Sequence, residues 1–138
     1  MNGLSNKTVV ITGALGGIAK ATIRVLDAYQ MNFILLDVVD EDTAFLSSLS
    51  SKWHYFQMDI ASTEVVDQLK NKVSTLYAEV DLIIHAAGLY QHIELEDLSY
   101  DKWNQQITIN LSANYYLIKS LLPLLSENSA IVNIASIA

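Results

Sequence analysis

Five short apolar runs, separated by segments with helical spacing, limit the folds that this chain can adopt. The runs cover residues 8–11, 33–36, 54–58, 82–84 and 130–134. Most of them are continuous rather than alternating, which is typical of strands that helices cover on both faces. Repeated alternation of strand and helix predicts parallel pairing through right-handed helical crossovers. We therefore predict a single doubly wound parallel α/β sheet.

Three stripes of residues at helical spacing indicate the helices between these runs. The stripes are Ile18, Thr22, Val25 and Tyr29; Val65, Leu69, Val73 and Leu76; and Trp103, Ile107, Leu111, Ile118 and Leu122. A short helix is also expected within residues 42–49, although the serines there favour turns and caps. Each stripe offers one helix face that the sheet can bury.

Composition excludes several classes of function. The chain has 138 residues, a net charge of −7 at pH 7 and no cysteine. Its acidity argues against binding to nucleic acid or to an anionic membrane surface. The absence of cysteine excludes disulfides, thiolate catalysis and Cys-based zinc sites. No apolar stretch reaches the ~18 residues of a membrane span, and the N-terminus lacks the apolar core of a signal peptide. We therefore expect a cytoplasmic protein.

The first apolar run continues directly into a glycine-rich turn at residues 12–19, followed by the first helical stripe. Here Gly13 lets the chain turn off the strand, Gly17 lets backbone N–H groups approach a pyrophosphate, and Ala19 lets helix and sheet pack closely. The helix N-terminus adds partial positive charge. A glycine turn without a ligand is the alternative. We expect a dinucleotide phosphate site formed by Gly13, Leu15, Gly16, Gly17 and Ile18.

The second apolar run ends in Asp37, which follows Gly13 by 24 positions. A carboxylate at that strand end accepts hydrogen bonds from a ribose 2′-OH and repels a 2′-phosphate. No Arg or Lys stands beside it, since Val38 comes next and Leu15 and Gly16 occupy the loop. The alternative is that Asp37 merely begins a solvated acidic turn. We predict NAD(H) as the cofactor.

The pattern Thr-Gly-x3-Gly-x-Gly after a first strand is the signature of the short-chain dehydrogenase/reductase family. Residues 12–19 resemble it, with Ala19 in place of the last glycine. The resemblance implies a Rossmann fold and hydride transfer between a nicotinamide and a small-molecule alcohol or carbonyl substrate. It also implies that Asp59 and Ile60, after the third run, border the adenine. Without the resemblance, Asp59 would equally be an acid at a helix N-terminus.

The fourth run ends in a segment that corresponds to the family's Asn-Asn-Ala-Gly. Ala87 and Gly88 match it, whereas His85 and Ala86 replace the asparagines. The resemblance implies that the nicotinamide ribose passes over Ala86, Ala87 and Gly88. We interpret His85 as a structural group rather than a catalytic base. His92, with Glu94 and Glu96, is interpreted as loop surface, so no metal site is expected.

Two further residues match catalytic positions of the family. Asn110 fits the asparagine that bends the central helix, and Ser136 fits the serine whose hydroxyl bonds the substrate carbonyl oxygen. The family's Tyr-x3-Lys pair, which donates the proton, follows that serine. Tyr115 and Lys119 have this spacing but precede Ser136, so we interpret them as a coincidence.

The resemblance spans the whole chain but only about the first half of a family member, because the sequence ends two residues after Ser136. We expect residues 1–138 to be an NAD(P)-binding Rossmann domain that is truncated after the fifth strand and inactive by itself. The alternatives are a non-catalytic dinucleotide-binding module and an interaction protein that has lost the ligand. The partly apolar helix side at Ile109 and Tyr116 predicts a homo-oligomer, a dimer or tetramer.

Overall fold

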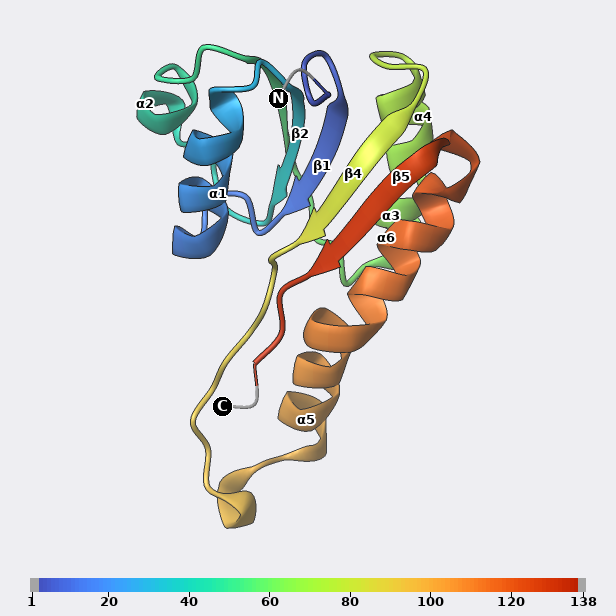
Figure 1. The fold of residues 1–138 in the computed structure, drawn as a ribbon. Helices are drawn as coiled ribbons and strands as arrows, with labels where there is room; N and C mark the ends of the chain where they lie inside the picture. The colour runs from blue at the N-terminus through green and yellow to red at the C-terminus, as the bar shows by residue number, and fades with distance from the viewer. Residues whose placement is uncertain (1–2, 137–138) are drawn as a thin grey trace.

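A computed structural model describes residues 3–136, and its centre is one parallel sheet (Figure 1). The strands are β1 (Thr8–Thr12), β2 (Asn32–Asp37), β3 (Lys52–Gln57), β4 (Val80–His85) and β5 (Leu125–Asn133). They lie in the order β3-β2-β1-β4-β5, and every neighbouring pair is parallel. The predicted doubly wound parallel sheet is confirmed, and each predicted run forms a strand.

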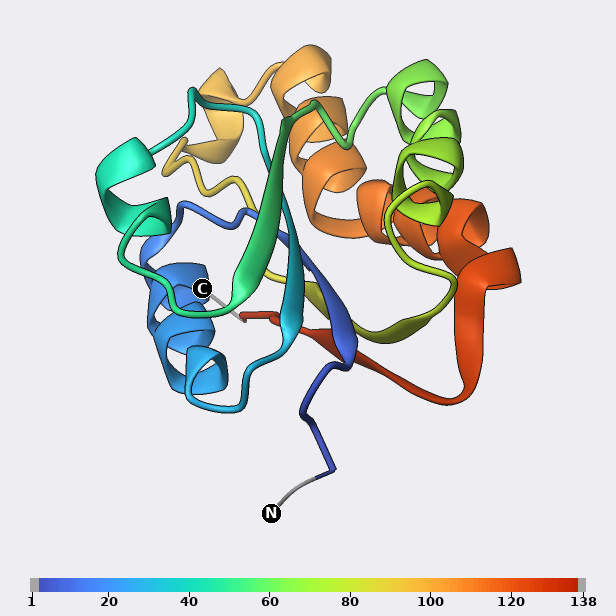
Figure 2. The same ribbon diagram turned by 90° about the horizontal axis from the view of Figure 1, so that it is seen from above.

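Helices cover both faces of the sheet, as the view from above shows (Figure 2). One layer holds α1 (Gly17–Asp27) and the short α2 (Thr43–Leu46). The other holds α3 (Thr63–Asp67), α4 (Leu69–Ser74) and α6 (Ala113–Leu121). Alternate residues of each central strand enter opposite cores, which is why both β1 and β2 read as continuous apolar runs. In β1, Val9 and Ile11 face α1, whereas Val10 faces α6.

A long helical segment rises from the lower part of the molecule along the right-hand side of the sheet (Figure 1). It consists of α5 (Tyr100–Ile107), the π-helical turn η2 (Thr108–Ser112) and α6, and the 3₁₀ turn η3 (Leu122–Leu124) leads from it into β5. Residues 86–94 leave β4 as an extended segment and reach the 3₁₀ turn η1 (Leu95–Asp97). Within residues 3–136, every helix is too short or too polar to cross a bilayer.

Two of the three predicted stripes fall on helices of the structure, but most of their residues are not the ones that these helices bury. Ile18 and Val25 are 60% and 64% exposed, whereas α1 buries Ala19 and Ile23. Leu111 is likewise 66% exposed, and the long helix instead buries a different stripe in α6, namely Ala113, Leu117 and Leu121. The reason is that each helix carries apolar residues on more than one face, so spacing alone cannot tell which face meets the sheet.

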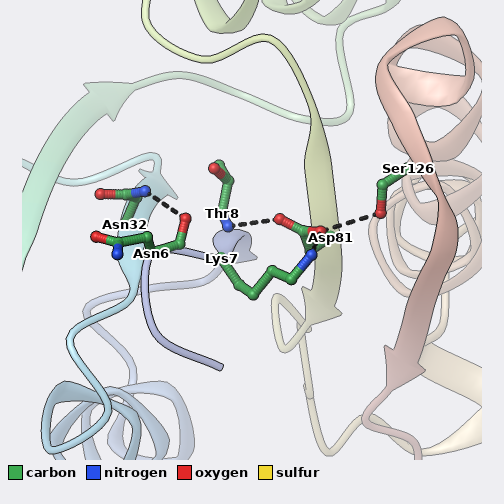
Figure 3. Close-up of polar contacts among 6 residues, drawn as sticks. All are labelled: Asn6, Lys7, Thr8, Asn32, Asp81 and Ser126. Carbon is green, nitrogen blue, oxygen red and sulfur yellow. Dashed lines mark hydrogen bonds and ion pairs between the residues drawn. The ribbon is translucent and has the colours of Figure 1, made fainter. Parts of the chain in front are cut away.

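At the amino ends of the strands, Asp81 joins β1, β4 and β5 (Figure 3). Its carboxylate accepts the Thr8 backbone N–H at 2.9 Å, the Lys7 ammonium at 2.8 Å and the Ser126 hydroxyl at 3.0 Å. Burial opposes ionisation, but these donors outweigh it and lower the pKa of Asp81. This cluster stabilises the amino ends of the strands, whereas the predicted site lies at their carboxyl ends.

Candidate cofactor-binding site

A cavity of about 530 Å³ opens at the carboxyl ends of the strands. It lies where the strand order reverses between β1 and β4, the place at which open α/β sheets bind ligands. Of the residues predicted to bind the cofactor, those that line it are Gly13, Leu15, Gly16, Asp37, Asp59, Ile60, Ala86, Ala87 and Gly88. Gly17, Ile18, Asn110 and Ser136 are not among the described lining residues.

Gly13 forms the turn at the end of β1, and no other residue fits there. Its φ is +61°, and a Cβ atom would lie 2.7 Å from both the Cα and the N of Ala87. The next residues close the turn, because the Gly16 N–H donates to the Gly13 carbonyl at 2.9 Å. The glycine therefore permits both the left-handed backbone and the close approach of the segment that follows β4.

The N-terminus of α1 has the properties of an anion site. Its N-cap, Gly16, offers no side-chain oxygen, and no acidic residue stands in the first turn. The first N–H groups of a helix have no intrahelical partners and carry partial positive charge. A Cβ atom at Gly17 would meet nothing within 4 Å, so open space lies beside the start of the helix. A phosphate group fits this space and this charge.

Asp37 joins the glycine turn to the end of β2. One carboxylate oxygen accepts the Leu15 N–H at 2.9 Å, and the other accepts the Val38 N–H at 2.7 Å. Each oxygen of an ionised carboxylate has two acceptor positions, so both can accept further hydrogen bonds. The side chain thus holds the loop and also presents negative charge to the cavity.

On the β3 side, the chain turns at Asp59 before α3 begins. The Asp59 carboxylate accepts the Ala61 N–H at 2.9 Å, while the Ser62 hydroxyl accepts the Val65 N–H at 3.4 Å and caps the helix. Asp59 therefore shapes the turn rather than capping α3. This turn places both Asp59 and Ile60 in the cavity wall.

Beneath the cavity, His85 and Thr12 connect β4 to the glycine turn. The His85 Nδ1 lies 2.9 Å from the Thr12 hydroxyl, which accepts the Ala87 N–H at 3.2 Å. His85 is 2% exposed, and burial lowers its pKa, although the Ile109 carbonyl offsets part of the shift. The neutral imidazole can accept the Thr12 hydroxyl hydrogen. This geometry agrees with the interpretation of His85 as a structural group.

Asn110 lies in the π-helical turn and holds the segment that follows β4. Its carbonyl oxygen accepts the Leu89 N–H at 2.7 Å, and its amide donates to the Leu89 carbonyl at 2.8 Å. A π-turn inside an α-helix is often a functional irregularity. The side chain therefore positions the cavity wall, because the neighbouring Gly88 and Leu89 both line it.

The helix side at Ile109 and Tyr116, which we expected to contact a second subunit, is partly covered within the chain itself. Ile109 lines the cavity and Tyr116 packs against the core, and both are only partly exposed. The π-turn changes the register of the helix, so faces drawn at α-helical spacing do not continue through it. The exposed large apolar side chains of this helix are Tyr100, Trp103, Ile107, Leu111 and Tyr115, with Leu122 in the following turn.

Ser136 is exposed and lies three residues after the end of β5. The Ile134 N–H donates to the His85 carbonyl at 2.9 Å, so the chain after β5 runs beside the end of β4. Tyr115 and Lys119 lie elsewhere, because Tyr115 is 60% exposed and the Lys119 ammonium stands 5.8 Å from the centre of its ring. Neither belongs to the described cavity lining. Their position outside the cavity agrees with our interpretation that the Tyr-x3-Lys spacing of these two residues is a coincidence.

Several lining residues were not predicted from the sequence: Leu36, Val38, Val39, Met58, Leu89, Gln105 and Ile109. Val38 and Val39 directly follow Asp37, so adjacency was a usable signal for them. Gln105 and Ile109 reach the cavity from the long helix, and no local pattern marks them.

Comparison with known proteins identifies the family. The short chain dehydrogenase family matches residues 7–138. A 2,5-dichloro-2,5-cyclohexadiene-1,4-diol dehydrogenase of Sphingobium indicum is 30% identical over 143 residues, which are 100% of this chain and 57% of that protein. A short-chain dehydrogenase/reductase (glucose/ribitol dehydrogenase) from Brucella melitensis has a TM-score of 0.90 and 33% identity, with 97% of this chain and 58% of that one covered.

An NADH-dependent reductase, A1-R′, solved in complex with NAD, has the same fold, with a TM-score of 0.88 at 23% identity; 99% of this chain and 62% of that one are covered. The chain thus spans less than two thirds of the length of these relatives. The match over residues 7–138 shows that the chain belongs to the short-chain dehydrogenase/reductase family.

Proposed function

We propose that the protein is an NAD(H)-dependent oxidoreductase that transfers hydride between the nicotinamide and an alcohol or carbonyl substrate. The observation that carries the cofactor choice is the Asp37 carboxylate, which the Leu15 and Val38 N–H groups hold in the cavity wall beside the glycine turn. A carboxylate in this place favours a ribose 2′-OH over a 2′-phosphate. Membership of an oxidoreductase family supports the reaction class.

When bound, the nicotinamide group supplies the hydride donor or acceptor. The chain's own residues bind and orient it: the N–H groups at Gly17 and Ile18 take the pyrophosphate, and Asp37 takes the adenosine ribose. Asp59 and Ile60 border the adenine. The small residues Ala86, Ala87 and Gly88 leave room for the nicotinamide ribose. Ser136 bonds the substrate carbonyl oxygen, and Asn110 positions the segment that lines the site.

Asp37→Ala tests the cofactor choice, with NADH and NADPH affinities measured by fluorescence titration. We expect NADH binding to weaken by about tenfold to a hundredfold and the relative affinity for NADPH to rise, because loss of a hydrogen bond to a charged group costs about 1.5–3 kcal/mol. Asp67→Ala is the matched control, since Asp67 is exposed on α3 outside the cavity. Unchanged relative affinities in Asp37→Ala would refute the assignment.

A non-catalytic dinucleotide-binding module is the alternative for the isolated 138-residue chain. Its one Tyr-x3-Lys pair, Tyr115 and Lys119, lies on an exposed helix face rather than in the cavity. We propose that this chain by itself binds NADH without turnover. Steady-state assays with assorted carbonyls and alcohols test this, and turnover that Tyr115→Phe abolishes would show that the helix pair is catalytic.

We also propose that the protein is a homo-oligomer. The exposed apolar side of α5, η2 and α6, which includes Trp103, Leu111 and Tyr115, is not covered by the described part of the chain. A second copy of the same helix would bury it in a self-complementary interface. Light scattering after gel filtration should show a dimer or tetramer that Leu111→Glu dissociates, and a monomeric wild-type protein would refute the proposal.

A further inference from the structure

The segment 38–42, between β2 and α2, begins at the cavity wall beside Asp37 and continues away from it, since only its first two residues line the cavity. Val38 and Val39 line the cavity, but they are 61% and 50% exposed, so side-chain burial does little to hold the segment in place. The three residues that follow, Asp40, Glu41 and Asp42, are all acidic. The negative charge next to the cofactor site therefore depends on how the backbone of this segment is fixed.

Two side chains of β3 fix that backbone. The Tyr55 hydroxyl donates to the Val39 carbonyl at 2.5 Å. The Gln57 amide lies 3.2 Å from both the Val38 carbonyl and the Asp40 carboxylate and donates to both. Because β3 pairs with β2 in register, with Gln57 opposite Asp37, these donors stand next to the point where the chain leaves the sheet. They hold the backbone path whatever side chains positions 38 and 39 carry.

The other end of the segment is fixed by Asp42. One of its oxygens accepts the Lys20 ammonium of α1 at 2.6 Å, and the other accepts the Phe45 N–H at 3.0 Å. Lys20 and Phe45 thus tie this end to α1 and α2. Between this fixed end and β2, the bonds from Tyr55 and Gln57 hold the middle of the segment.

The charges of the segment act together at the Tyr55 hydroxyl. Burial raises the pKa of Tyr55 to about 12, and the carboxylates of Asp37, Asp40 and Glu41 contribute to the shift. The phenol is therefore a neutral donor at physiological pH. Its environment shows that three negative charges lie close enough to one point to reinforce one another.

We propose that Tyr55 and Gln57 are positioning residues for cofactor choice, because their bonds to the Val38 and Val39 carbonyls hold the acidic segment at the cavity wall, where it rejects a ribose 2′-phosphate. The inference rests on the proposed NAD(H) function and extends it. Discrimination comes from Asp37 together with a segment that β3 holds in place. A segment that swings outward by about a Debye length, ~8–10 Å, loses most of its effect on a phosphate through ionic screening.

The experiment measures NADH and NADPH dissociation constants of the intact protein by fluorescence titration, at one ionic strength. Tyr55→Phe removes only the hydroxyl, and Gln57→Leu keeps the approximate size but removes the amide. We expect the ratio of the NADPH to the NADH dissociation constant to fall about fivefold in each variant and about 20-fold in the double variant, since each loses one or two hydrogen bonds. Tyr77→Phe is the control, because Tyr77 is half-buried in the other core, away from the segment.

Deuterium exchange provides a readout besides affinity. The amides of residues 38–42 should exchange faster in Tyr55→Phe and Gln57→Leu, while the amides of the glycine turn should not change. A ratio that stays within twofold of wild type in the double variant, or two dissociation constants that rise equally, would overturn the positioning role while leaving the NAD(H) proposal intact. A wild-type protein that binds neither dinucleotide, or that prefers NADPH, would overturn both.

Discussion

The glycine turn offers a sharp test, because two of its glycines should fail for different reasons. At Gly13 the φ of +61° disfavours any residue with a Cβ atom, at a cost of about 1–2 kcal/mol. An alanine there would also place its Cβ 2.7 Å from the Cα and N of Ala87 and 3.0 Å from the carbonyl carbon of Ala86. All three are backbone atoms that no rotamer change can move, and forced overpacking costs about 1–3 kcal/mol. We expect Gly13→Ala to lower the free energy of unfolding by about 2–5 kcal/mol.

Gly17→Ala is the matched variant. A Cβ atom at Gly17 meets nothing within 4 Å, and the residue begins α1, where alanine is a better helix former than glycine. The free energy of unfolding should stay unchanged or rise by up to about 1 kcal/mol. In the proposed phosphate site, however, the missing side chain of Gly17 lets the backbone N–H groups approach the pyrophosphate, and an added methyl group would obstruct that approach. NADH binding should therefore weaken by about tenfold or more, although the fold is intact.

Urea denaturation followed by circular dichroism measures the first effect, and NADH fluorescence titration measures the second. The close contact between Gly13 and Ala87 is refuted if Gly13→Ala unfolds within about 0.5 kcal/mol of wild type. The phosphate site at the start of α1 is refuted if Gly17→Ala binds NADH as tightly as wild type. A loss of stability in both variants would contradict the open space at Gly17.

Three other side chains give further predictions. Asn110→Ala removes both bonds to the Leu89 backbone, so the free energy of unfolding should fall by about 1–3 kcal/mol and the Leu89 amide should exchange faster with deuterium. Burial lowers the pKa of His85 from its ordinary 6.5, so the unfolded chain takes up a proton at a higher pH than the folded chain does. The free energy of unfolding should therefore decline from about pH 6.5 downward, as measured by urea denaturation. His85→Asn should remove this decline. Asp81→Ala leaves the Thr8 N–H unsatisfied and should cost about 1–3 kcal/mol. Because the pKa of Asp81 is lowered in the folded protein, protonation of its carboxylate costs stability as the pH falls below the ordinary value of 3.8. Asp81→Ala should therefore lose less stability in acid than wild type does.

Each of these variants has a control in the same chain. His92→Gln changes a histidine whose side chain is 79% exposed and should leave the decline below pH 6.5 in place. Lys7→Ala removes only the exposed partner of Asp81 and should destabilise the protein much less than Asp81→Ala does. Asn104→Ala changes an exposed asparagine of α5 and should leave the Leu89 amide protected. Equal effects in a variant and its control would contradict the corresponding contact.

The parallel sheet could be predicted from the sequence because its signal is local. A strand covered on both faces must be apolar at every position, so runs such as residues 33–36 stand out without any knowledge of their partners. The turn at Gly13 could be predicted for the same reason, since the left-handed backbone and the close approach of Ala87 both demand a residue without a side chain. Asp37 could be predicted as a site residue because it stands where the apolar run of β2 ends.

The helix faces and part of the cavity wall could not be predicted in this way. Whether Ile23 or Val25 is buried depends on how α1 is rotated against the sheet, and both are apolar. Ile109 reaches the cavity because a π-turn shifts the register of the long helix by a residue, and no sequence spacing announces that shift. Gln105 is polar and lies on α5, so only the tertiary arrangement places it beside the cavity.

The contacts around the cavity form a connected set, and this has a consequence for binding. The Thr12 hydroxyl accepts the Ala87 N–H and contacts His85, so β1 and β4 are joined where the cavity floor begins. Asn110 holds Leu89 through both backbone groups, and Asp37 holds the glycine turn through Leu15. Protein groups make all of these bonds, so the floor and both walls have supports that do not depend on a cofactor. A preformed cavity avoids the ordering cost that a flexible one incurs on binding. Mutations such as Asn110→Ala should therefore weaken NADH binding even though the side chain does not line the cavity.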